Sequence, residues 1–122
     1  MSQRPLDVVR ACLDAYVRKD RAAIEALIAD DFHFTSPLDN AIDRATYFAR
    51  CWPNSENFAR FDVVHAVEQS ERAFVVYEAQ TRQGKRLRNC EVHTVRGGKV
   101  IAVEVYFGWD LPHKAPAGGF TS

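Results

Sequence analysis

The chain has 122 residues, of which 47% are hydrophobic and 26% are charged, proportions that are normal for a soluble globular protein. Sixteen basic side chains balance sixteen acidic ones, which argues against a broad surface for nucleic acid or for an anionic membrane. This length predicts a single domain over residues 1–122, with an irregular tail from about 110 to 122. Three widely spaced cysteines, Cys12, Cys51 and Cys90, are typical of reduced thiols in a cytoplasmic protein.

The N-terminal segment predicts two helices. Asp20 is the expected N-cap of the second helix, which we expect to end near Asp30. The first helix is predicted from about Pro5 to Arg18, and the charged Asp7 and Arg10 within it leave no apolar run for a signal peptide or a membrane span. Its buried stripe is given by apolar residues at helical spacing, namely Leu6, Val9, Leu13, Tyr16 and Val17.

A short strand and a third helix follow. Phenylalanine alternates with polar residues in FHFTS (32–36), which predicts a strand with two different faces. Asp39, Asn40 and Asp43 come next, and turn formation and helix capping explain them more simply than a place at a pocket mouth. Asp43 is then the expected N-cap of a helix that stops at Trp52, because a proline follows it.

The second half of the chain predicts a β-sheet. Glycine-containing turns separate the last three of four runs that are rich in β-branched and aromatic residues, which is typical of hairpins. Helices first and antiparallel strands afterwards predict an α+β fold, in which the helices cover one face of a single curved sheet. The four expected strands are 61–67, 73–81, 87–95 and 100–107.

The last hairpin decides which way Glu91 points, and the residues leave two registers open. A two-residue turn at the glycine pair places Glu91 opposite Glu104 on the outer face, where two like charges are unfavourable. A three-residue loop with an adjoining bulge places Glu91 opposite Val103, with Asn89 and His93 also pointing inwards.

An inward-facing Glu91 suggests chemistry. A carboxyl desolvated among apolar residues suits general acid–base catalysis, and His93, two residues further on the same strand face, is its candidate partner. The alternatives are a structural polar pair and a solvent-facing pair. Trp52, Tyr77 and Phe107 are candidates for the wall of an apolar cavity, although core packing explains each of them singly. Histidines and cysteines lack metal-ligand spacing, so we expect no metal and no cofactor.

Two segments carry a resemblance to a known superfamily: AAIEALIADDFHFTSPLDNAIDRATYFARCWPN (22–54) and RNCEVHTVRGGKVIAVEVYFGW (88–109). They resemble nuclear transport factor 2-like proteins and, more narrowly, the SnoaL-like members of that superfamily. The resemblance implies a cone-shaped α+β barrel with three N-terminal helices on a curved, mainly antiparallel sheet. It also implies a pocket between helices and sheet, a homodimer, and the inward register of Glu91. The same fold serves enzymes, binders and partner proteins.

Ketosteroid isomerases are the best understood of these relatives. They use a tyrosine on the first helix, an aspartate before the proline of the first strand, and a second acid on the strand before the last hairpin. The corresponding positions here are Cys12, Ser36 and Glu91. Two of the three residue types differ, which argues against the isomerase reaction. Tyr16, one helical turn beyond Cys12, is the candidate hydroxyl donor instead.

The sequence therefore predicts a cytoplasmic, dimeric protein that binds a mostly apolar small molecule, with neither nucleic acid nor membrane as a partner. Candidate reactions are cofactor-independent isomerisation, cyclisation, hydration or dehydration by proton transfer. A binding module without chemistry and a partner-binding dimer remain the alternatives. The catalytic candidates are Glu91, His93 and Tyr16. The ligand-binding candidates are Cys12, Phe34, Ser36, Trp52, Tyr77, Asn89, Val103 and Phe107.

Overall fold

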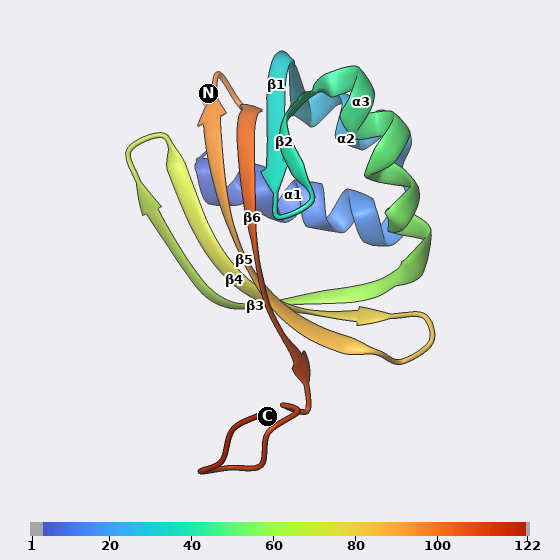
Figure 1. The fold of residues 1–122 in the computed structure, drawn as a ribbon. Helices are drawn as coiled ribbons and strands as arrows, with labels where there is room; N and C mark the ends of the chain where they lie inside the picture. Colours follow the sequence, from blue (N-terminus) through green and yellow to red (C-terminus); the bar gives the residue numbers. More distant parts are fainter. Residues whose placement is uncertain (1–3, 122) are drawn as a thin grey trace.

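The computed structural model describes residues 4–121 and shows three helices gathered on one side of a curled sheet (Figure 1). The helices are α1 (Pro5–Arg18), α2 (Arg21–Leu27) and α3 (Arg44–Arg50), with a 3-10 segment, η1 (Trp52–Asn57), after α3. The six strands are β1 (Ile28–Ser36), β2 (Asp39–Asp43), β3 (Phe58–Gln69), β4 (Arg72–Thr81), β5 (Arg86–Arg96) and β6 (Lys99–Leu111). No helix in the described part of the chain is long and apolar enough to cross a membrane.

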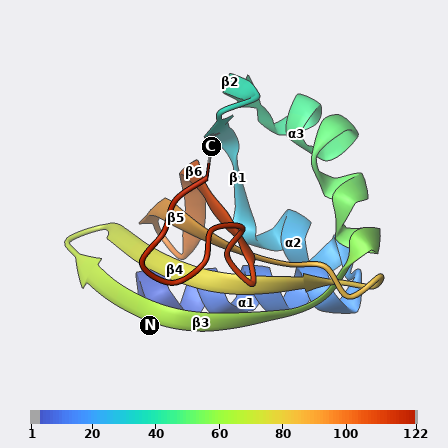
Figure 2. The ribbon, with the colours of Figure 1, turned by 60° about the horizontal axis from the view of Figure 1, so that its bottom comes forward.

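The sheet has the order β2-β1-β6-β5-β4-β3 and is mixed, because β1 pairs with β6 in parallel while all other neighbours are antiparallel. The predicted α+β class and the helix-covered, mainly antiparallel sheet are confirmed. The expected barrel is not closed, since β2 and β3 remain the two edges of the sheet. Figure 2 shows how strongly the sheet curls, with α1 running along its concave side.

The helices begin where the sequence predicts. Pro5 opens α1, and the first helix ends at Arg18 as expected. The side chain of Asp20 accepts a hydrogen bond from the backbone N–H of Ala23, and Asp43 caps α3 in the same way. The second helix ends at Leu27 instead of near Asp30, because Ile28 already starts β1 and buries its side chain in the core.

The strand β2 was not predicted from the sequence, which assigned its polar residues to a turn and a helix cap. In the structure, His33 pairs with Asp43 and Phe34 with Ile42, so β1 and β2 form a hairpin. The backbone N–H of Ala41 also donates to Oγ1 of Thr35. A strand at the edge of a sheet does not need alternating apolar residues, so β2 lacks the sequence pattern from which strands are predicted.

The last hairpin combines features of both predicted registers. Its turn has two residues, since Arg96 pairs with Lys99, and the turn glycines have φ of 61° and 77°, which favours glycine. A bulge within β6 leaves Ile101 without a partner, and His93 then pairs with Val103. Glu91 lies opposite Val105, so neither predicted partner is correct, but its side chain points inwards as in the bulged alternative.

Two apolar clusters make up the core. The larger one joins the helices to β1 and β6 and includes Val8, Phe32 and Val100. The smaller one lies between α1 and the strands β3, β4 and β5, and includes Val9 and Val75. After Leu111 the chain leaves the sheet and continues as an irregular segment that projects away from the body (Figure 1).

Candidate functional site

A cavity of about 210 Å³ lies between the helices and the concave face of the sheet. Two of its lining residues, Leu38 and Phe107, are 71% and 54% exposed and mark its mouth. Aromatic side chains account for much of the wall, because large rings occupy inward positions on both helices and strands. The aromatic lining residues are Tyr16, Phe32, Phe34, Tyr47, Phe58, Phe61, Tyr77 and Phe107.

Glu91 is held in this cavity by two hydrogen bonds from neighbouring strand positions. The hydroxyl of Tyr77 on β4 donates to Oε2 of Glu91 at 2.5 Å, and Nε2 of His93 lies 2.7 Å from Oε1. The side chains of Glu91 and His93 are only 14% and 6% exposed. The carboxyl is therefore fixed in position, while each of its oxygens keeps a further lone pair for a ligand.

The environment of His93 indicates which ring nitrogen carries the hydrogen. Nδ1 is buried and has no hydrogen-bond partner among the described residues. Nε2 faces Oε1 of Glu91, so Nε2 carries the hydrogen and donates it to the carboxyl. This hydrogen bond orients the carboxyl of Glu91.

Tyr77 is itself held by a hydrogen-bond chain that reaches the edge of the cavity. Nδ2 of Asn89 lies 3.4 Å from the Tyr77 hydroxyl, and Oδ1 of Asn89 accepts the backbone N–H of Gly108 at 3.2 Å. Burial, with the negative charge of Glu91 adding to it, raises the pKa of Tyr77 well above its usual value. The phenol thus stays protonated and remains a donor to Glu91.

A second polar group consists of two tyrosines from different helices. The hydroxyls of Tyr16 on α1 and Tyr47 on α3 share a hydrogen bond, and both side chains line the cavity. Burial raises the pKa of both phenols, so both stay protonated. The pair has two hydroxyl hydrogens and uses one between them. Within residues 4–121 the other has no protein acceptor, which leaves a donor for a ligand oxygen.

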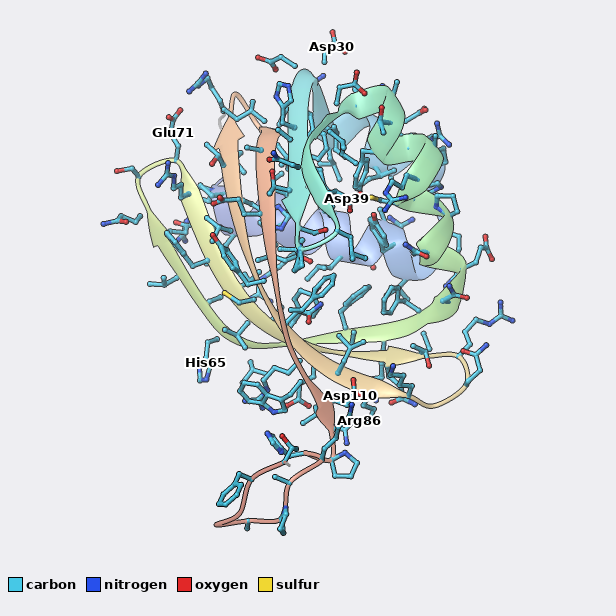
Figure 3. All side chains as sticks on the ribbon, in the orientation of Figure 1. Asp30, Asp39, His65, Glu71, Arg86 and Asp110 are labelled. Carbon is cyan, nitrogen blue, oxygen red and sulfur yellow. The ribbon has the colours of Figure 1, made fainter. Side chains whose placement is uncertain are left out.

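A third polar group lies at the β1–β2 turn. The hydroxyl of Ser36 donates to Oδ2 of Asp39 at 2.9 Å and accepts the backbone N–H of Leu38. Asp39 forms an ion pair with Arg50, and this hydrogen bond lowers the pKa of the Asp39 carboxyl. Figure 3 shows Asp39 between β2 and α3. The hydroxyl hydrogen of Ser36 is used in the bond to Asp39, which stabilises the turn. Towards a ligand, this hydroxyl can therefore only accept a hydrogen bond.

The cysteines of the cavity are protonated thiols. Burial, together with the charge of Glu91, raises the pKa of Cys12 to about 12. Burial likewise raises the pKa of Cys51 to about 11. Since the thiolate is the nucleophilic form, neither residue is set up for nucleophilic catalysis. All three cysteines of the chain are free.

The structure brings most of the predicted site residues together. Trp52 is the exception, because it packs against the ring of Tyr16 at a centroid distance of 4.9 Å and does not line the cavity. Sequence reasoning missed Tyr47 and preferred a turn role for Asp39. The predicted residues that line the cavity are Cys12, Tyr16, Phe34, Ser36, Tyr77, Asn89, Glu91, His93, Val103 and Phe107.

The described part of the chain contains no group of three or more histidine, cysteine or acidic residues that could hold a metal ion.

Comparison with known protein families gives one match: a model of the SnoaL-like domain matches residues 9–103. The chain belongs to this family. A search among curated proteins gives no match to this SnoaL-like chain.

Solved structures of similar fold carry several different names. A putative ketosteroid isomerase from Kribbella flavida is 16% identical, with coverage of 94% of this chain and 84% of that chain and a TM-score of 0.75. An LEH-like epoxide hydrolase from M. tuberculosis is 15% identical, with coverage of 88% and 84% and a TM-score of 0.74. A putative polyketide cyclase from Sinorhizobium meliloti is 17% identical, with coverage of 81% and 93% and a TM-score of 0.66. At these identities the likeness establishes the fold alone.

Proposed function

We propose that this SnoaL-like protein is an enzyme that binds a mostly apolar small molecule and catalyses cofactor-independent proton transfer on it. Isomerisation, cyclisation, hydration and dehydration all proceed by such steps. The observation that carries the proposal is the carboxyl of Glu91, held by Tyr77 and His93 in an aromatic cavity. A fixed, desolvated carboxylate within reach of a bound substrate is the usual arrangement of a general base.

The remaining polar groups have separate tasks in this proposal. Glu91 takes a proton from the substrate or from a water molecule, using the lone pairs that Tyr77 and His93 leave free. The unused hydrogen of the Tyr16–Tyr47 pair binds the substrate oxygen on which negative charge develops. Tyr77 and His93 keep the carboxylate in place, so no reorganisation is needed during the reaction.

The replacement Glu91→Gln tests the proposal. Turnover of an apolar carbonyl compound, found by screening absorbance changes, should fall by about 10²–10⁴-fold, because the base is lost while the side-chain shape is kept. Glu104→Gln is the matched control: Glu104 is an exposed carboxylate on the neighbouring strand and pairs with Val92. Activity that survives in the Glu91→Gln protein would show that Glu91 is not the base. Binding without turnover in the parent protein would favour the non-catalytic alternative.

We further propose a cytoplasmic homodimer formed through the outer face of the sheet. The free cysteines support a reducing compartment. Figure 3 shows His65 of β3 on the side of the sheet away from the helices. Strand pairing continues from His65 into an apolar row across β4, β5 and β6, and an apolar row on the open face of a sheet is suited to contact with a second copy. The row consists of Val76, Cys90 and Tyr106.

Native mass spectrometry and size exclusion test the dimer. Tyr106 is 54% exposed in the single chain, so Tyr106→Glu should produce monomers without unfolding. Lys114→Glu, an exposed change in the tail, is the control. A monomeric parent protein at micromolar concentration would contradict the proposal.

A further inference from the structure

The cavity is asymmetric in charge. Glu91 and Asp39 are its two lining carboxylates, and within the described chain no lysine or arginine lines it. Asp39 is compensated by Arg50, whose side chain is 56% exposed and approaches from outside. Among the described residues, Glu91 accepts side-chain hydrogen bonds only from Tyr77 and from His93. No lysine or arginine among residues 4–121 forms an ion pair with Glu91.

The surroundings of Glu91 make this uncompensated charge matter. The carboxylate is largely removed from water, and an unpaired charge in an apolar environment is costly. Its field extends through the cavity: besides burial, the charge of Glu91 raises the pKa of Cys12 and Tyr16 on α1 and of Tyr77 on β4. A cation that enters the cavity gains from the same low dielectric, because attraction between charges is stronger there than in water.

The aromatic wall is suited to the same kind of guest. The faces of aromatic rings carry partial negative charge and attract ammonium groups. Phenols from α1, α3 and β4 line the cavity together with phenylalanines from β1 and β3. The rings can therefore pack on a hydrocarbon group and also stabilise a positive charge beside it. An anionic guest, by contrast, would meet Glu91 without finding a cationic side chain to bind it.

We propose that the natural ligand is an amine with a large apolar part, bound as its ammonium ion to one oxygen of Glu91 and with the hydrocarbon part against the aromatic wall. The other carboxylate oxygen keeps its free lone pair for proton transfer. This inference rests on the proposed function in that it concerns the same cavity, and it adds the class of substrate. Carboxylic acids, phosphate esters and other anions are excluded as ligands. The assignment concerns binding, so it is tested without knowledge of the reaction.

Calorimetric titration with three probes of one skeleton, 3-phenylpropylamine, 3-phenylpropanol and 3-phenylpropionate, tests the inference at about pH 7.5, where the amine and the acid are both charged. The amine should bind about tenfold more tightly than the alcohol, which corresponds to one charge-assisted hydrogen bond. The acid should bind more weakly than the alcohol. Glu91→Gln should bring the amine to the level of the alcohol.

Two further variants keep the result decisive. Glu91→Asp retains the charge and should retain the preference for the amine, while Glu104→Gln, on the outer face, should leave all three affinities unchanged. Circular dichroism confirms that each variant is folded. The inference is overturned if the alcohol or the acid binds best, if the preference survives Glu91→Gln, or if none of the probes binds. A preference for the alcohol would leave the proton-transfer proposal intact, since turnover tests that proposal separately.

Discussion

At the scale of single residues, the site depends on donors that hold a carboxylate and on donors that remain free. Glu91 and His93 were predictable as a pair, because residues two apart on a strand share a face in any register. Tyr47 was not, since helical spacing shows that a side chain is buried but not which group it meets. Its hydroxyl was the available clue, because a buried phenol usually finds a hydrogen-bond partner. Asp39 was assigned to a local turn. Turn formation is enough to explain an aspartate at this position, so the sequence offers no reason to place Asp39 in the cavity wall.

The tyrosine pair leads to a prediction for catalysis. In the proposed mechanism Tyr47 donates to Tyr16, and Tyr16 presents the unused hydrogen to the substrate, so Tyr16→Phe removes the donor to the substrate oxygen. Turnover should fall by about 10²-fold, the typical cost of losing a donor to a developing oxyanion. Steady-state kinetics measures the change. Tyr106→Phe, on the exposed outer face, is the control and should leave the rate unchanged. Equal rates for the parent and Tyr16→Phe would remove the tyrosine pair from the mechanism.

At the scale of elements, most helix and strand positions followed from periodicity, capping and turn residues. The exceptions have physical causes. The strand β2 is short, polar and at an edge, so its pairing depends on β1 and not on its own pattern. The direction of the Glu91 side chain depends on the bulge at Ile101. No residue pattern around Ile101 distinguishes this bulged position from an ordinary paired strand position. Long-range pairing decided both features, and single-chain propensities do not contain that information.

A close backbone approach between β5 and β6 gives the prediction for this scale. A Cβ atom at Gly108 would lie 2.1 Å from the carbonyl oxygen of Arg88, so Gly108→Ala must force the strands apart beside a second bulge. The same movement releases Asn89, which accepts the Gly108 N–H and contacts Tyr77. Urea unfolding should show a loss of about 1–3 kcal/mol, typical of overpacking. Glu104→Ala on the same strand is the control, and an equally small change in both would refute the packing argument.

At the scale of the whole molecule, the curled open sheet and the helices enclose one aromatic space, and this general shape was predictable from the order of elements and the family resemblance. The enclosure also has a thermodynamic effect. Burial raises the pKa of Tyr16, Tyr47 and Tyr77, and of Cys12 to about 12. The folded chain therefore holds these protons at pH values where the unfolded chain has lost them.

Stability should consequently decline in alkaline solution. Below the unfolded-state pKa values, about 8.5 for the thiol and about 10 for the phenols, the stabilising contribution is fully present. As the pH rises above them, unfolding releases protons and the free energy of unfolding falls. Urea titrations between about pH 8 and pH 11 measure this slope. Tyr47→Phe should reduce it and Lys114→Gln should not, because Lys114 is exposed in the tail and lies outside the proposed dimer face. A flat profile would contradict the buried, protonated state of the phenols.

Because Ile101 in β6 is unpaired, the inward-facing residues of β5 and those of β6 lie on the same side of the sheet. On β5 the inward set contains Glu91 and His93, and on β6 it contains Val103 and Val105. With the two-residue turn and no bulge, the two sets would fall on opposite sides, and Glu104 would stand where Val105 now closes the cavity. Pairing Ile101 with Thr94 in a regular ladder would thus place a further carboxylate in the apolar cavity. Whether this one backbone position is paired or bulged is therefore a determinant of the cavity's chemistry, independent of which side chain occupies it.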